Sequence, residues 1–494
     1  MISTQLPSIA SFPPRPHAAP LDWQQYARAF DQFIMDPASH VRFTTPSQHT
    51  AFTAFLESSH YGTANYELVT YGPIVLGKLL RGDDVSELLP GLMDYYNREI
   101  GIFFNGPSDS RSEMWYLMYA NALAAHTIRR WGAQYPQWLA AWRQSVETLR
   151  QLAKRIDYDF NHQGYDFRTG QPWTDRDIYR QPDAIGGYAY LMLLGYEMFG
   201  DVNYRTEAET ALARYLAFSD NPWYEVPDGS MAALAAARLN AYGGDFDLHK
   251  ALVWLLDPNA ALVAGKWGEH EVNGLSRGWR FSTPESAYSM ESLMILPFIL
   301  PVARYDPRIA RDLGCYALHV AANARLFYSS FMRGAESRAD LSPAIAYERL
   351  LQEHEGHSPY ATGDFQGHKS IYGGAYALWW DALARSTDDP YILQLDLTST
   401  DFLAADAHPT YLYYNPWPEE RRVRLNVGTG GCDLYDVTEH RFCGHGIEGD
   451  TEIELPPLGA RVLAKVPAGA RQLREGHRLL VNDIVVDFLV NSGV

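Results

Sequence analysis

The sequence has few cysteines, no long apolar run and no long basic run, and each absence excludes a class of protein. Cys315, Cys432 and Cys443 are few and odd in number, which favours reduced thiols in a cytoplasmic protein over a disulfide-rich secreted one. No stretch reaches about 18 uninterrupted apolar residues, the length typical of a membrane-spanning helix, so we expect no membrane partner. The opening run MISTQLPSIASFPPRPHAAPLDW has no basic segment followed by an apolar core, so we expect no signal peptide.

The charge balance and the missing catalytic signatures exclude further classes. Asp and Glu total 59 against 41 Lys and Arg, a net charge of −18, and this field would repel a nucleic-acid backbone. Neither Gly-x-x-x-x-Gly-Lys-Ser/Thr nor Gly-x-Gly-x-x-Gly after a strand occurs, and we expect no cofactor. No Gly-x-Ser-x-Gly elbow occurs either, and Cys315 lies inside a helical run where a structural thiol is the usual role.

The chain of 494 residues is too long for one ordinary core, and the spacing of its apolar residues changes near Asp388-Asp389-Pro390. Before this point apolar segments of helical length follow one another without intervening strands, which disfavours a doubly wound α/β fold. After it, runs such as TYLYYNP, RRVRLNV and TEIEL have the period-2 alternation of strands. The expected helical pairs are 64–81 with 84–99, 112–132 with 135–156, 183–199 with 202–218, 229–240 with 245–256, and 283–303 with 307–330, while 21–35 and 47–58 precede them and 369–386 follows.

The two members of a helical pair differ in their apolar pattern. AIGGYAYLMLLGYEMFG and SIYGGAYALWWDALA are apolar on nearly every face, so each should be buried, whereas DVNYRTEAETALARYLAF is amphipathic. Residues 185–191 also echo 372–378, which indicates a repeated hairpin. We therefore predict a mainly α fold, an (α/α)6 toroid of about six hairpins, over residues 1–388.

This organisation resembles the carbohydrate-active enzymes built on an (α/α)6 barrel, over roughly residues 20–386. The tail, with LYYNPWPEERRVRLNV, CDLYDVTEHRF and TEIELPPLGARVLAKV, is similar to the antiparallel β-sandwich appended to many glycoside hydrolases. The resemblance implies a β-sandwich domain over residues 389–494 and an enzyme that acts on carbohydrate. It identifies neither the exact family nor the reaction.

The loops that enter the buried helices are rich in acidic and aromatic residues. Aromatic residues make up 13% of the chain, and many stand in polar loops where packing alone does not require them. Aromatic rings stack on apolar sugar faces, and glycoside hydrolysis needs two carboxyl groups that flank one bond. In a toroid these loops meet at one end of the barrel, so we expect an oligosaccharide site there. The candidate catalytic residues are Asp183, Glu269, Glu271, Glu285 and Asp364, and the candidate substrate-binding residues are Glu113, Trp173, Tyr179, Asp228, Trp267, His270, Arg277, Trp279, Tyr360 and His368.

Helix capping is an alternative role for part of this set. Residues 282–285 (Ser-Thr-Pro-Glu) and 110–113 (Ser-Arg-Ser-Glu) have the pattern of a capping box. Asp183 and Asp228 stand where helices should begin, and a negative charge there complements the helix dipole. Capping and catalysis are compatible, because a carboxylate in the first turn of an inner helix also faces the cleft.

The loop before residue 282 has no capping role to explain its residues. Trp267 and Trp279 flank Glu269 and Glu271, and a solvated loop charge is the simplest alternative for each glutamate. Exposed tryptophan is costly unless a ligand covers it, which favours a sugar site. We favour Glu269 or Glu271 with Asp183 or Asp364 as the catalytic pair, with acid and base unassigned.

The segment QEHEGHSPYATGDFQGH contains His354, His357 and His368 beside acidic residues. Its spacing does not match His-Glu-x-x-His and no thiolate is near, so we predict no metal site. Histidines that hydrogen-bond to substrate, or a plain polar loop, explain the segment better.

Two other functions compete with a glycoside hydrolase. A polysaccharide lyase or other uronate-acting enzyme would use a Tyr or His base and groups that neutralise a carboxylate; the candidates are His270, Asn273, Arg277, Arg280 and Tyr288. A non-catalytic carbohydrate-binding protein would tolerate amides in place of the loop carboxylates.

Overall fold

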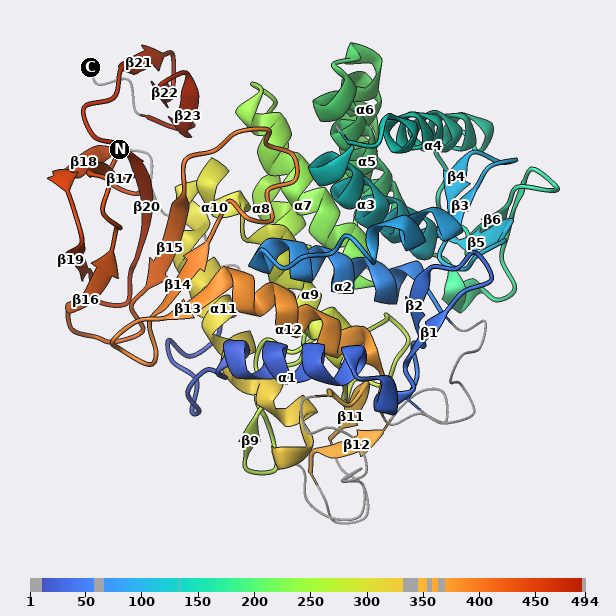
Figure 1. Cartoon of the computed structure of the whole chain (residues 1–494), viewed down its shortest axis with the longest axis horizontal. Helices are drawn as coiled ribbons and strands as arrows, with labels where there is room; N and C mark the ends of the chain where they lie inside the picture. The colour runs from blue at the N-terminus through green and yellow to red at the C-terminus, as the bar shows by residue number, and fades with distance from the viewer. Residues whose placement is uncertain are drawn as a thin grey trace.

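Six of the helices in the described part of the chain form a closed ring (Figure 1). The structure is a computed structural model that describes residues 11–56, 66–132, 134–331, 345–352, 358–362 and 369–490. Each helix of the ring packs on the next, and the last packs on the first. In ring order these inner helices are α2 (Leu68–Arg81), α3 (Met114–Trp131), α5 (Ala184–Phe199), α7 (Val226–Ala241), α9 (Ser289–Ile299) and α12 (Ile371–Leu383).

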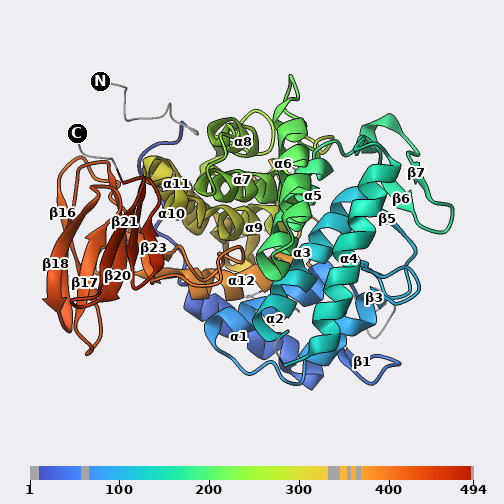
Figure 2. The same ribbon diagram turned by 90° about the horizontal axis from the view of Figure 1, so that it is seen from above.

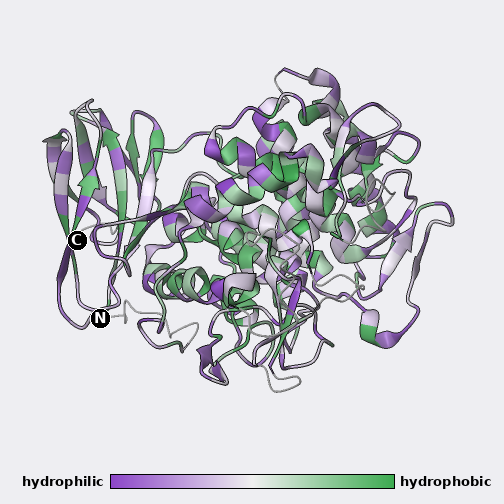
Figure 3. Ribbon diagram, turned by 60° about the horizontal axis from the view of Figure 1, so that its bottom comes forward, coloured by the Kyte–Doolittle hydropathy of each residue, from purple (hydrophilic) through white to green (hydrophobic). Residues whose placement is uncertain are grey.

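The inner helices are buried because they carry apolar residues all round. Every residue of α9 is buried, as are the first twelve residues of α5, from Ala184 to Gly195. In Figure 3 the hydrophobic residues concentrate in the helices, and the loops around them are more hydrophilic. The prediction of buried inner helices is confirmed.

A second layer of amphipathic helices packs outside the ring. α1 shows the pattern, since it buries Trp23, Ala27, Phe30 and Ile34 along one stripe against α12. The outer helices are α1 (Trp23–Met35), α4 (Pro136–Arg155), α6 (Val202–Leu216), α8 (Leu248–Leu255), α10 (Val302–Tyr305) and α11 (Ala310–Asn323). Short 3-10 turns are η1 (Pro37–Ser39), η4 (Asp177–Tyr179), η5 (Pro307–Ile309), η6 (Ala324–Phe327) and η7 (Ser329–Phe331). No helix in the described ranges is both long and apolar enough to cross a bilayer.

The segments 84–99 and 47–58 are not the α-helices that the pattern predicted. The first forms a 3-10 turn, η3 (Leu89–Tyr95), which packs on α2 in the place of an outer helix. Pro90 cannot donate to a preceding turn, and a Cβ at Gly91 would lie 2.5 Å from the Tyr71 hydroxyl oxygen. The second contains β2 (Thr50–Phe52), which pairs with β1 (Arg42–Thr44).

Two inner helices begin later than predicted because strands precede them. β10 (Ser286–Tyr288) pairs with β11 (Arg349–Leu351), which pairs with β12 (Tyr360–Thr362), so the helix expected from residue 283 begins at Ser289. The Thr283 hydroxyl donates to Glu285 (3.2 Å), and the capping box does not form at that point. β5 (Arg111–Glu113) directly precedes α3 in the same manner; it pairs with β6 (Gly164–Asp166), which pairs with β7 (Gln171–Trp173). β3 (Tyr96–Asn97) pairs with β4 (Ile102–Phe103), and β8 (Lys266–Trp267) with β9 (His270–Glu271).

The C-terminal strands form small antiparallel sheets beside the helices (Figure 2). A six-stranded sheet has the order β13 (Ala384–Ser386), β14 (Leu393–Asp396), β15 (Thr410–Tyr414), β20 (Ala460–Pro467), β17 (Cys432–Asp436) and β18 (Arg441–Ile447). The other sheets are β16 (Arg421–Asn426) with β19 (Asp450–Leu455), and β21 (Gln472–Glu475), β22 (Arg478–Val481) and β23 (Ile484–Asp487). Tyr413 and Leu463 of the six-stranded sheet belong to one buried hydrophobic cluster with Val423 and Leu455 of the two-stranded sheet β16–β19.

Candidate active site

The first turns of the inner helices surround a cavity of about 140 Å³, which we call the mouth pocket. Its lining comes from α2, α3, α9 and α12, from the residue that precedes α7, and from the segments around residues 279 and 348. The lining residues are Val69, Trp115, Tyr116, Glu225, Trp279, Tyr288, Ser289, Met290, Glu291, Glu348 and Tyr372. Elements far apart in the sequence therefore meet at the end of the ring where the inner helices begin.

Aromatic rings form much of the mouth pocket and continue onto the surface. Trp115 and Tyr116 stack with ring centroids 3.7 Å apart. Trp279 lies both in the pocket and at the start of an aromatic rim, because its ring is 6.2 Å from Tyr179 and 6.1 Å from Phe281. Phe281 is 46% exposed, so the rim presents an apolar ring to solvent beside the pocket.

Glutamates supply the acidic groups of the pocket. Burial, and then the negative charges of Glu291 and Glu113, hold the pKa of Glu225 well above its ordinary value, which favours the protonated form of this carboxyl. Glu291 stands in the first turn of α9, where the positive end of the helix dipole favours the carboxylate form. The pocket thus places a carboxyl with a raised pKa beside a carboxyl at the positive end of a helix dipole.

Asp183 fixes the backbone that carries Glu225. Its Oδ2 accepts hydrogen bonds from the backbone N–H of Tyr224 (2.7 Å) and of Glu225 (3.3 Å), and the residue is only 1% exposed. Burial raises the pKa of Asp183 and of Asp228, which lies in the first turn of α7. Both predicted residues are buried at the starts of inner helices, and neither is among the residues that line the pocket.

Glu113 ties together three loops at the rim. Its carboxylate accepts from the side-chain amides of Gln163 (3.0 Å) and Gln181 (2.9 Å). Gln181 in turn accepts from the backbone N–H of Trp115 (2.8 Å), which lines the pocket. Glu113 also contributes to the raised pKa of Glu225, so it acts on the pocket electrostatically without lining it.

The glutamates of the loop 266–280 lie outside the mouth pocket. Glu269 is exposed on the hairpin of β8 and β9, and its neighbour His270 is half-buried. Glu271 is buried and pairs with His319 (2.8 Å), while it accepts from the backbone N–H of His17 (2.8 Å) and from Asn273 (2.7 Å). The loop is thus bound to α11 and to the N-terminal segment.

The remaining predicted residues occupy several places around the mouth. Trp267 is buried beneath its hairpin, and Glu285 is exposed. Arg277 donates to the carbonyl groups of Arg280 (3.1 Å) and Ser282 (2.9 Å), which fixes the turn that carries Trp279.

Some predicted residues lie farther out or beyond the described part of the chain. Trp173 is half-buried under the guanidinium of Arg111, 3.7 Å from its ring centre, and Tyr360 is half-buried in β12. Asp364 and His368 lie outside the described residues. Residues 353–357, which include His354 and His357, lie outside them as well. Within the described ranges, no cluster of His, Cys, Asp and Glu has the grouping needed to hold a metal ion.

The sequence left Glu225, Glu291 and Glu348 out of the candidate set. Glu225 stands directly before an inner helix and follows Trp223-Tyr224, which is a usable signal for a site residue. Glu291 is the one acidic residue in the run SMESLMILPFI, so its signal is a lone charge in a fully buried helix.

No protein-family model matches the sequence, and no curated protein matches it either. Among solved structures, the chain is similar to a sugar epimerase from a ruminal bacterium (10% identity, TM-score 0.47, 72% of this chain and 98% of that one). It is also similar to a family 76 glycoside hydrolase from a bovine Bacteroides thetaiotaomicron strain (8%, 0.45, 73% and 77%). A third is a GH127 beta-L-arabinofuranosidase from Geobacillus stearothermophilus T6 (11%, 0.43, 95% and 86%). Function is therefore inferred from the residues of the mouth.

Proposed function

We propose that this chain is a glycoside hydrolase that acts on an oligosaccharide at the mouth pocket. The observation that carries the proposal is a pocket lined by glutamates and aromatic rings, in which burial and neighbouring carboxylates raise the pKa of Glu225. Rings that stack on sugar faces and a pair of carboxyl groups in different protonation states are what hydrolysis of a glycosidic bond requires. We further propose that residues 389–494 form a separate β-sandwich domain.

Glu225 is the general acid in this proposal. Its proton passes to the glycosidic oxygen as the bond from that oxygen to the anomeric carbon breaks. The carboxylate of Glu291 stabilises the positive charge that develops at the anomeric carbon. A water molecule then forms the new bond to that carbon and gives up a proton to one of the two carboxylates. Asp183 is a positioning residue, because its hydrogen bonds fix the backbone of Glu225.

The size of the pocket supports cleavage at the end of a chain. A cavity of about 150 Å³ binds a molecule of the size of benzene, and the mouth pocket has about 140 Å³, so it can hold no more than one sugar ring. The next sugar would stack on the aromatic rim formed by Tyr179, Trp279 and Phe281.

Replacement of each glutamate by its amide tests the proposal. We expect Glu225→Gln and Glu291→Gln to reduce kcat/KM on a cleaved oligosaccharide by about 10²–10⁴-fold, the usual contribution of an acid or base. An aryl glycoside with a good leaving group needs no protonation, so it should restore much of the activity of Glu225→Gln but not of Glu291→Gln. Glu269→Gln, on the exposed hairpin, is the matched control and should keep full activity.

Two results would contradict the proposal. Full activity in both folded pocket variants would exclude these glutamates as the catalytic pair. Binding without turnover on every glycoside tested would favour the non-catalytic alternative.

A lyase is the second candidate, because Tyr288 lines the pocket and accepts a hydrogen bond from Arg349 (3.1 Å). A tyrosine base beside an arginine that neutralises a uronate carboxylate would suit β-elimination. Incubation with uronate-containing polysaccharides distinguishes the two reactions, since elimination leaves an ultraviolet-absorbing double bond in the product and hydrolysis does not. Tyr288→Phe should abolish the elimination.

A further inference from the structure

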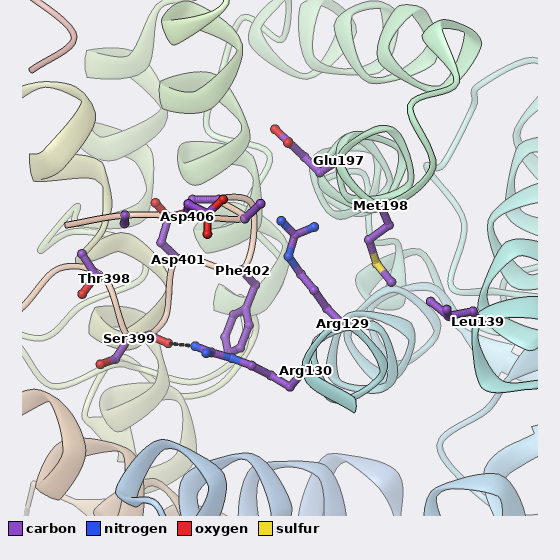
Figure 4. A pocket seen from close by; sticks show the side chains of 13 residues that line it. Arg129, Arg130, Leu139, Glu197, Met198, Thr398, Ser399, Asp401, Phe402 and Asp406 are labelled. Carbon is purple, nitrogen blue, oxygen red and sulfur yellow. Dashed lines mark hydrogen bonds between the residues drawn. The ribbon is translucent and has the colours of Figure 1, made fainter. Parts of the chain in front are cut away.

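A larger cavity, of about 690 Å³, lies at the other end of the inner helices, and we call it the rear cavity (Figure 4). Arg129 and Arg130 reach it from the last turn of α3, and Glu197 and Met198 from the last turn of α5. The opposite wall is the segment 398–407 between β14 and β15. The α3 helix rises about 1.5 Å per residue, so these arginines stand roughly 21 Å from Trp115 of the mouth pocket.

The two arginines are held in place by the facing segment. Arg130 donates to the Ser399 carbonyl (2.8 Å), as Figure 4 shows, and Arg129 donates to the Leu403 carbonyl (3.4 Å). A guanidinium carries five N–H donors, so most donors of each arginine remain for a ligand. The guanidinium of Arg129 projects into the space between Glu197 and Phe402 in Figure 4.

Neither arginine has an ion-pair partner among the described residues, where no carboxylate oxygen lies within 4.0 Å of either guanidinium. This is unexpected in a chain with 59 acidic and 41 basic residues. Burial first, and then the neighbouring charge of Arg129, lower the pKa of Arg130, while the charge of Asp396 has a smaller, opposing effect. The positive charges of the two arginines also add to the burial that lowers the pKa of His126.

Most carboxylates of the cavity already have partners. Glu197 pairs with Arg238 (2.8 Å) and accepts from Tyr242 (2.6 Å). Asp401 pairs with Arg304 (2.9 Å) and accepts from Tyr305 (2.6 Å). Asp406 is the other carboxylate in the lining, and it is exposed.

We propose that the rear cavity binds a small phosphorylated molecule, such as a sugar phosphate, through Arg129 and Arg130. Two guanidinium groups match the charge and the oxygen geometry of a phosphate dianion. The volume falls in the range of small-molecule sites, roughly 300–1,000 Å³, and Leu139, Met198 and Phe402 offer an apolar wall to the body of the ligand. The site is separate from the mouth pocket and does not depend on the reaction proposed there.

Calorimetric titration of the full chain at constant ionic strength tests this site. The probes are glucose 6-phosphate, inorganic phosphate, gluconate and glucose. We expect glucose 6-phosphate to bind more tightly than inorganic phosphate or gluconate, and glucose not to bind at the rear cavity. Arg129→Gln with Arg130→Gln should weaken the binding of glucose 6-phosphate at least tenfold, whereas Arg168→Gln, on an exposed hairpin, should leave it unchanged.

A second variant keeps the test independent of any folding defect in the arginine variant. Asp406→Asn removes the remaining negative charge of the cavity from an exposed position, so it should tighten the binding of glucose 6-phosphate. The proposal is overturned if the affinity for glucose 6-phosphate is unchanged by both the arginine and the Asp406 substitutions. It is also overturned if gluconate binds as tightly as glucose 6-phosphate, or if no phosphate compound binds.

Discussion

The buried pair of Glu271 and His319 should make a measurable, pH-dependent contribution to stability. Burial alone would raise the pKa of Glu271, but His319 and the N–H of His17 outweigh it and lower the pKa to about 2. Burial would lower the pKa of His319, but Cys315 and Glu271 outweigh it and raise the pKa to about 9. Each shift, from 4.5 and from 6.5, amounts to about 3 kcal/mol of stabilisation, and the contact between Glu271 and His319 contributes to both.

The sign of the pH dependence follows from the two shifts. The raised pKa of His319 gives stability that is complete below pH 6.5 and is lost as the pH rises to about 9. The lowered pKa of Glu271 gives stability that is complete above pH 4.5 and is lost as the pH falls to about 2. The pair therefore stabilises the protein most between these limits.

Glu271→Gln tests this contribution. At pH 6 the variant should unfold with a free energy about 3 kcal/mol lower than the wild type, because the His319 charge is left buried beside an amide. Denaturant unfolding at pH 6 and pH 9 should show the wild type losing about that difference and the variant losing less, because Cys315 and the Pro13 carbonyl still act on His319. Glu269→Gln, two residues earlier and exposed, is the control, with an effect within about 0.5 kcal/mol. An equal pH dependence in the wild type and Glu271→Gln would refute the reasoning.

Three further predictions follow from buried groups elsewhere. The pH profile of kcat/KM should fall on the alkaline side as Glu225 loses its proton above its raised pKa, and this alkaline limb should be absent from the residual activity of Glu225→Gln. Gly187→Ala should lower stability by about 1–3 kcal/mol, measured by denaturant unfolding, because a Cβ there would lie 2.0 Å from an Asp228 carboxylate oxygen; an unchanged midpoint would contradict this packing. Arg304→Met should cost about 3–5 kcal/mol by leaving Asp401 buried without its partner, and Asp401→Asn in the same chain should recover part of the loss.

The inner ring could be predicted from sequence because the apolar residues on every face of its helices indicate that these helices are buried. A helix such as α5 or α12 has no polar face, so it can only be an inner helix. The outer position beside α2 could not be predicted in this manner. Its segment is apolar enough for a helix, but Pro90 lacks the N–H of a helical turn and Gly91 packs closely against Tyr71, and the second of these features is set by packing.

The location of the candidate site and the types of residue in it could be predicted from the sequence, but not which acidic residues line the pocket. The loops before the inner helices do meet at one end of the ring, and Trp279 does line the pocket there. Which acidic residues face the ring axis depends on contacts across the chain. Glu271 is held by the backbone of His17, 254 residues away in sequence, and nothing local to its loop indicates that contact.

The contrast between Glu271 and Glu225 shows why the local sequence pattern alone does not indicate which loop glutamates line the pocket. Both are partly or fully buried beside tryptophan, and their sequence surroundings are similar. The partner of Glu271 is a cation, His319, so its carboxylate is stabilised in the charged form and serves the fold. The neighbours of Glu225 are other carboxylates, so its pKa is raised, as the proposed role of general acid requires. The charge of the neighbours, which only the folded ring brings together, separates a structural glutamate from a candidate acid.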